Sequence, residues 1–265
     1  MVYFKNNIFY HYIVLKNKIK YFFYNKKNNK FLFILSPPYC GSTLLHQVIS
    51  TSKFVSVNNN RGTREGQTLP IVRDIFFNNK DKWDEKIDLD WTFIRKIWMK
   101  YWDLTFPILL EKSPPNILRA KSLDKYFSPA FFLILYRNPY AHCESLIRRD
   151  KISGKEAAHF AIKCLKIQKN NSRCLTNSVQ LSYEELTDRI EISVKKITQL
   201  LPELSDIQFD LEFSAHNFQK KNQKIKNLNC EKFSKLPIKD LEIINDIFIE
   251  EIELLNSFNY SLLDF

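Results

Sequence analysis

The sequence predicts an α/β fold in three layers, with a central parallel sheet between two layers of helices. Two short, fully apolar runs, FLFIL (31–35) and FFLILY (131–136), are typical of strands buried on both faces. Segments with apolar residues at helical spacing separate these runs along the chain. Strands that alternate with helices favour a parallel sheet covered by helices on both sides.

Length and composition agree with one such domain. The chain has 265 residues, of which 45% are hydrophobic, enough for a large core. Prolines 37 and 38 and Gly41 interrupt the uncharged stretch 31–52, so a membrane-spanning helix is a poor interpretation of it. With no internal repeat or long linker, we divide the chain into an N-terminal segment, 1–30, and one domain, 31–265.

Residues 1–30 are predicted to form a basic amphipathic helix. They carry seven lysines and no acidic residue. Apolar residues recur there at spacings of three and four, namely Phe4, Ile8, Tyr12, Leu15, Ile19 and Phe22. This apolar face either packs on its own domain, which we favour, or attaches to an anionic membrane surface or a partner.

The net charge and the cysteines indicate which binding partners and which cellular compartment to expect. Although the net charge is +11, the 235 residues after the N-terminal segment carry 33 basic and 29 acidic residues. This mild excess suits a polyanionic nucleotide better than a nucleic acid, for which no binding motif is found. The five cysteines lack the spacing of metal ligands, so we expect no bound metal. We expect the cysteines to be free thiols. With no secretory signal apparent, we expect a cytoplasmic protein, with or without membrane association through its N-terminal helix.

The other elements follow in order. After the strand 31–35 we expect a helix over 42–52, a strand over 54–57, helices over 66–78 and 90–103, a strand over 108–110, the strand 131–136, helices over 140–150 and 154–172, a strand over 179–181, and helices over 184–201 and 238–256.

Three strands end in polar clusters, and ligands of parallel sheets bind at the carboxyl ends of strands. The first cluster is SPPYCGSTLL (36–45). A strand, a tight loop with a glycine and a Ser-Thr pair opening a helix form a geometry that cradles phosphate, because free backbone N–H groups face the anion. Ser42 and Thr43 add hydroxyl donors. The Walker A pattern GxxxxGK[ST] is absent, and a Gly-Ser-Thr start alone is also a common helix cap.

The other two clusters supply positive charge. Arg137 ends the strand 131–136 and Ser145 follows eight residues later, a combination that suits a second phosphate unless the arginine pairs with a carboxylate. Lys112 follows the strand 108–110 and is placed to reach the same crevice, where it would act as a cation on a transferring group. A lysine exposed on the surface is the alternative interpretation.

Together these clusters resemble the sulfotransferase superfamily, which has a P-loop NTPase-like fold and takes a sulfuryl group from 3′-phosphoadenosine 5′-phosphosulfate (PAPS). Residues 38–45 stand in the register of its 5′-phosphosulfate loop, Arg137 and Ser145 match its 3′-phosphate element, 111–114 (EKSP) matches its lysine-bearing segment, and 183–186 (YEEL) matches a later YExL motif. The resemblance implies PAPS contacts from Tyr39, Cys40, Gly41, Ser42, Thr43, Leu44, Arg137, Ser145 and Tyr183, with Lys112 assisting transfer.

The chain departs from the family pattern at Tyr39, where the loop normally carries Arg or Lys. Losing a charge-assisted phosphate contact costs about 1.5–3 kcal/mol. Arg61, Arg64 and Lys112 are candidates to supply the missing charge. For the general base, Glu65 is the first candidate, since it follows the second strand where some branches carry a glutamate base; His46, expected to be packed, and His142 are alternatives.

The expected function is therefore sulfuryl transfer from PAPS to a hydroxyl or amine. The EKSP segment and Glu65 are closer to the carbohydrate and protein branches than to the cytosolic small-molecule branch, so a carbohydrate, lipid-linked glycan or protein acceptor is favoured. Two alternatives are a catalytically impaired module that binds PAP (the product, 3′-phosphoadenosine 5′-phosphate) or PAPS, and a P-loop nucleoside-phosphate kinase. The kinase would lack the loop lysine and a clear acidic strand end.

Overall fold

The computed structural model describes residues 2–23, 28–77, 82–214 and 222–264. Its centre is a five-stranded sheet in the order β2-β3-β1-β4-β5, in which every neighbouring pair is parallel. The strands are β1 (Lys30–Leu35), β2 (Val55–Val57), β3 (Ile108–Lys112), β4 (Ala130–Tyr136) and β5 (Ser178–Ser182). The predicted α/β class with a parallel sheet is confirmed. A short antiparallel pair, β6 (Phe213–Ser214) and β7 (Asn222–Gln223), lies outside the sheet.

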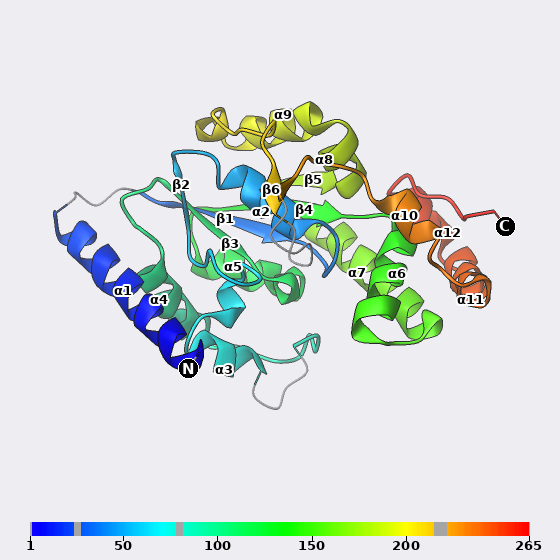
Figure 1. The fold of residues 1–265 in the computed structure, drawn as a ribbon, viewed down its shortest axis with the longest axis horizontal. Coiled ribbons are helices and arrows are strands. Elements are labelled where there is room, and N and C mark those ends of the chain that lie inside the picture. The colour runs from blue at the N-terminus through cyan, green and yellow to red at the C-terminus, as the bar shows by residue number, and fades with distance from the viewer. Residues whose placement is uncertain (1, 24–27, 78–81, 215–221, 265) are drawn as a thin grey trace.

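Helices cover both faces of the sheet (Figure 1). They are α1 (Val2–Phe23), α2 (Ser42–Ile49), α3 (Val72–Phe77), α4 (Trp91–Tyr101), α5 (Ala120–Tyr126), α6 (Pro139–Asp150), α7 (Gly154–Cys174), α8 (Tyr183–Asp188), α9 (Ile190–Leu200), α10 (Asn229–Phe233), α11 (Ile238–Ile249) and α12 (Ile252–Asn256).

Alternation along β1 creates a core on each face. Phe31 and Phe33 point into a cluster that contains Trp98 of α4, whereas Leu32 and Ile34 point into a cluster with helices α2 and α9. Successive side chains of a strand point to opposite faces, so a strand covered on both sides must be apolar throughout. The continuous apolar run that predicted this strand therefore reflects the two cores.

Element boundaries differ from the prediction in a few places. The helix expected over 66–78 is instead a 3₁₀ turn (Gly66–Thr68) followed by α3. Pro70 separates them, and Ile71 next to it has a left-handed φ of 72°. A proline disfavours helical geometry in the residue before it and lacks the N–H that a helix would use. Strand β3 also extends two residues beyond the expected end, so that Lys112 is its last residue.

The apolar face predicted to pack α1 on its own domain is not the face that packs. Ile8, Leu15 and Ile19 are exposed, while Tyr10 and Val14 lie against the core beside α4. The helix has apolar residues on both sides, and spacing alone does not tell which side is buried. Among the described residues, no helix combines the length and apolar character needed to cross a membrane.

Candidate active site

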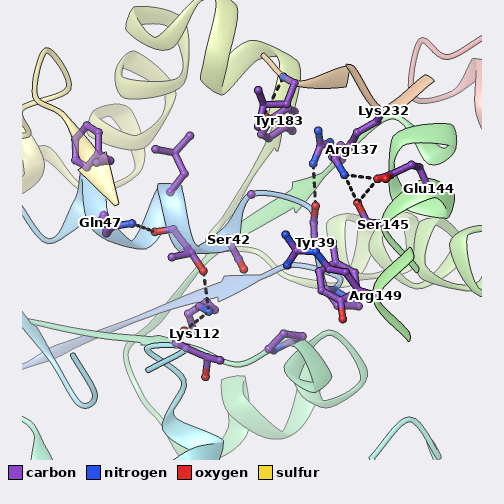
Figure 2. Close-up of a pocket in the computed structure, with 18 of the residues that line it drawn as sticks. Tyr39, Ser42, Gln47, Lys112, Arg137, Glu144, Ser145, Arg149, Tyr183 and Lys232 are labelled. Atoms are coloured by element: carbon purple, nitrogen blue, oxygen red, sulfur yellow. Dashed lines mark hydrogen bonds and ion pairs between the residues drawn. The ribbon is translucent and has the colours of Figure 1, made fainter. Parts of the chain in front are cut away.

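A cavity of about 530 Å³ opens at the carboxyl ends of the central strands. Nearly all the predicted site residues line it, namely Tyr39, Gly41, Ser42, Thr43, Leu44, Glu65, Lys112, Arg137, Ser145 and Tyr183. In Figure 2, Ser42 lies between Lys112 on one side and the group around Arg137 on the other. Cys40 is the exception: its side chain is buried, which raises the pKa of its thiol to about 12, and it does not line the cavity.

The loop before α2 requires glycine at position 41. Gly41 has a φ of 93°, in the left-handed region, and a Cβ there would lie 2.6 Å from Cδ2 of Tyr183. Helix α2 begins at the next residue, so the backbone N–H groups of its first turn have no partner within the helix. Together with the Ser42 and Thr43 hydroxyls, they form a ready site for an anion.

We expect Gly41→Ala to disrupt the anion site at the start of α2 and to lower the free energy of unfolding by more than Gly62→Ala does. Gly62 also has a positive φ, 54°, but a Cβ there meets no atom within 4 Å. The matched variant thus carries only the backbone strain of about 1–3 kcal/mol. Chemical denaturation of both variants measures the difference, and equal losses would show that contact with Tyr183 is unimportant.

Arg137 is fixed on three sides and has one donor left over. Its Nε donates to Oδ1 of Asn229 at 2.8 Å, its Nη1 donates to the Tyr39 carbonyl at 3.0 Å, and its guanidinium stacks 3.8 Å from the Tyr183 ring centroid. Nη2 is buried and has no hydrogen-bond partner among the described residues. A buried guanidinium donor without a partner is costly, so this atom points to an anionic ligand in the cavity.

Lys232 of α10, which was not predicted from the sequence, joins the same group. Its Nζ lies 2.5 Å from both Oγ of Ser145 and Oε2 of Glu144. Burial lowers the pKa of Lys232 to about 8, against the opposing effect of Glu144. Arg137, Ser145 and Lys232 thus offer two cations and a hydroxyl at one end of the cavity.

The pKa of Lys232 makes anion binding sensitive to pH. Because this pKa is about 8 in the ligand-free protein, the ammonium loses its proton as the pH rises from 7 to 9. We therefore expect the affinity of this end of the cavity for an anionic ligand to fall over this interval in the wild-type protein, and to fall less in Lys232→Met. Titration calorimetry at three pH values checks this, and identical profiles for the two proteins would rule out Lys232 as the titrating group.

Lys112 and Glu65 form an ion pair at the other end. The Lys112 Nζ lies 3.3 Å from Oε1 of Glu65, 2.7 Å from the Thr63 carbonyl and 3.5 Å from Oγ1 of Thr43. Burial lowers the pKa of Lys112, and the negative charge of Glu65 opposes that shift. Gln67 donates to the second oxygen of Glu65 at 2.5 Å. A cation and a carboxylate therefore lie together beside the phosphate loop.

The loop that carries Glu65 is held by Glu111, a fully buried residue of β3. Glu111 accepts hydrogen bonds from the backbone N–H of Gly66, from the Ser113 hydroxyl and from the Asn116 amide. Burial raises the pKa of Glu111 to about 7. The EKSP segment thus has two roles, because its glutamate positions the base candidate while its lysine faces the cavity.

Tyr39 brings a different cation to the loop. Its hydroxyl donates to Asp150 at 2.5 Å, and the guanidinium of Arg149 lies 4.9 Å from its ring centroid. Both Tyr39 and Arg149 line the cavity. Of the cations considered from the sequence, Lys112 lines the cavity, whereas Arg61 stacks 3.4 Å from the ring centroid of Phe9 on α1.

The two histidines considered as bases lie elsewhere. His46 and His142 are both buried and do not line the cavity. Burial and the nearby Arg137 lower the pKa of His142 to about 3, so its imidazole is neutral at physiological pH. The packing expected of His46 is observed, and Glu65 is the base candidate that reaches the cavity.

The cavity as a whole is strongly positive. Its lining contains nine basic residues, namely Lys82, Lys112, Arg137, Arg148, Arg149, Lys224, Lys226, Lys232 and Lys235, and three acidic ones, Glu65, Glu144 and Glu231. This balance suits a ligand with several negative charges. The lysines at 224–235 were missed, although their density in the sequence was a signal for them.

The fold resembles those of solved sulfotransferases. The sulfotransferase domain from the curacin biosynthetic pathway matches with a TM-score of 0.52 and 18% identity, over 89% of this chain and 100% of that domain. A sulfotransferase from Alicyclobacillus acidocaldarius has a TM-score of 0.51 and 12% identity, over 90% and 98%. One from Mycobacterium avium has a TM-score of 0.50 and 14% identity, over 96% and 82%.

No protein-family model and no curated protein matches the sequence. The structural matches span most of each chain, so the chain has the fold of these sulfotransferases. The expected sulfotransferase fold is thereby confirmed, and the branch within the superfamily stays a prediction.

Proposed function

We propose that this protein transfers a sulfuryl group from PAPS to a hydroxyl or amine of an acceptor. The observation that carries the proposal is the pairing of two anion sites in one cavity. Arg137, whose buried Nη2 has no partner among the residues described, lies at one end with Ser145 and Lys232, and the N-terminus of α2 lies at the other with Lys112. PAPS has two separate anionic groups, a 3′-phosphate and a 5′-phosphosulfate, and ADP and ATP lack the first.

Each anionic group would be held by a different set of donors. Arg137, Ser145 and Lys232 would bind the 3′-phosphate. Lys232 would then give up its hydrogen bond to the Glu144 carboxylate in favour of the phosphate. The first-turn backbone N–H groups of α2 and the Ser42 and Thr43 hydroxyls would bind the 5′-phosphosulfate. Tyr183, which packs against both Gly41 and Arg137, holds the two subsites at a fixed separation.

The residues beside the loop suit the transfer step. PAPS supplies an activated sulfuryl group, whose bond to the 5′-phosphate breaks as the acceptor oxygen or nitrogen bonds to sulfur. Glu65 would accept the proton that the acceptor loses. Lys112 would stabilise the negative charge that develops on the leaving phosphate oxygen, and its position at the end of a buried strand keeps it in place.

Arg149 would replace the cation that the loop lacks at Tyr39. We expect Arg149→Ala to weaken PAPS binding by about tenfold to a hundredfold, since a charge-assisted hydrogen bond contributes about 1.5–3 kcal/mol. Arg173→Ala, at an exposed position on α7, is the control. Introducing Tyr39→Arg into Arg149→Ala is expected to restore much of the loss. Unchanged binding in Arg149→Ala would leave Lys112 as the cation of this subsite.

For the acceptor we propose a carbohydrate, a lipid-linked glycan or a protein, on the strength of Glu65 and the EKSP segment. Incubation with sulfur-labelled PAPS and representatives of each class tests both the reaction and the acceptor. Labelled product that requires Lys112 supports the transferase. PAP binding without transfer to any class, together with PAPS that stays intact, would favour the impaired binding module that Tyr39 suggests.

A further inference from the structure

The outward side of α1 carries a continuous apolar stripe. It consists of Ile8, Tyr12, Leu15, Ile19 and Phe22, whose exposed fractions are 62%, 59%, 58%, 51% and 83%. At 3.6 residues per turn, these positions fall on one side of the helix. Isolated exposed apolar residues are ordinary, but a row of them along one helix marks an interaction surface.

The opposite side of α1 is the one that holds it to the domain. Tyr10, Ile13 and Val14 pack against the core, and Nδ2 of Asn17 donates to the Tyr101 carbonyl at 2.9 Å. Lys20 adds an ion pair with Asp103 at 2.5 Å. Helix α1 lies beside α4 at the edge of the molecule (Figure 1), and it is docked there without any use of the stripe, whose residues are exposed.

The charge around the stripe is of one sign. Lys16 and Lys18 are exposed on either side of it, and residues 1–30 contain seven lysines and no acidic residue. Two copies of this helix packed stripe to stripe would bring like charges together. An anionic surface would satisfy the lysines and the apolar side chains at once.

We propose that α1 binds the surface of an anionic lipid bilayer. The helix would lie in the plane of the interface, with the stripe among the acyl chains and the flanking lysines on the lipid phosphates. Its docked side would carry the α/β domain. This inference does not depend on the proposed sulfuryl transfer, since it uses none of the cavity residues.

Co-sedimentation of the full chain with vesicles tests the proposal. We expect the protein to bind vesicles of phosphatidylcholine with phosphatidylserine much more tightly than vesicles of phosphatidylcholine alone. The double variant Leu15→Gln with Ile19→Gln should weaken binding by about tenfold or more. Lys16→Gln and Lys18→Gln should each weaken it by roughly fivefold, and more salt should weaken it further.

A matched control changes two apolar residues elsewhere that are at least as exposed as Leu15 and Ile19. Ile238 and Ile249 on α11 have exposed fractions of 70% and 59%. Replacing both by Gln should leave vesicle binding unchanged, and circular dichroism should show that all variants are folded. Absence of binding to either vesicle, or equal loss in the control, would overturn the proposal. A dimer in solution that the Leu15 and Ile19 changes abolish would instead identify a second copy as the occupant.

Discussion

Replacing Arg137 by alanine is expected to weaken PAP binding by about tenfold to a hundredfold or more. Within the described part of the chain its buried Nη2 has no partner, so a 3′-phosphate would gain a charge-assisted hydrogen bond that costs the protein no existing contact. Such a bond contributes about 1.5–3 kcal/mol, and about 1.4 kcal/mol corresponds to a factor of ten. Titration calorimetry with PAP measures the loss directly.

The Arg137 variant needs two controls. Removal of the guanidinium also leaves Oδ1 of Asn229 and the Tyr39 carbonyl without their donor, so the melting temperature should fall as well. ADP binding, which does not use the 3′-phosphate subsite, should change much less than PAP binding if the fold persists. A parallel loss for both nucleotides would show that Arg137 acts on the structure of the site and not on the 3′-phosphate.

Replacing Lys112 by alanine is expected to reduce the rate of sulfuryl transfer by about 100- to 1,000-fold, the usual effect of losing one preorganised group that stabilises transition-state charge. PAP affinity should change far less, because most of the proposed contacts to the nucleotide come from other residues. Lys112 is fully buried beside Glu65, so its charge acts where water screens it little. Single-turnover rates with labelled PAPS measure the effect.

The matched control is Lys121→Ala, which removes an exposed lysine from α5 and should leave the rate unchanged. Glu65→Gln should also slow transfer without weakening PAP binding, and its effect should diminish at higher pH if Glu65 takes the proton. A Lys112→Ala protein that transfers at the wild-type rate would remove this lysine from the mechanism.

Much of the site was predictable because it lies where strands end. The apolar runs 31–35, 108–110 and 131–136 indicate buried strands, and the polar residues that follow the parallel strands meet at one edge of the sheet. Gly41 was conspicuous in a chain with only four glycines. Its φ and its contact with Tyr183 give the physical reason that the loop uses one.

The residues that were missed reach the site through packing between distant segments. Lys232 meets Ser145 across 87 positions in the sequence, because α10 packs on α6, and no local pattern predicts that contact. Arg149 could have been predicted from the sequence more easily than Lys232. It lies four residues after Ser145 on a predicted helix, and residues at that spacing share a helix face.

The N-terminal helix shows where periodicity reaches its limit. Its apolar residues occupy two opposite sides of the helix. The spacing of Ile8, Leu15 and Ile19 is that of a packed face, but these three residues are exposed. Tyr10 and Val14 are partly buried by partners on α4 and in the core, which the local sequence does not specify. The interrupted helix after Glu65 was foreseeable from Pro70 alone.

The most direct test of the central claim is calorimetric titration of the wild-type protein with PAP and, separately, with ADP. Both nucleotides carry two phosphates, but ADP has both of them at the 5′ position and lacks the 3′-phosphate, the group assigned to Arg137, Ser145 and Lys232. We predict micromolar binding of PAP and binding of ADP that is at least tenfold weaker. If PAP binds no better than ADP, the assignment of these three residues to the 3′-phosphate is wrong, and the proposal of PAPS as donor falls with it.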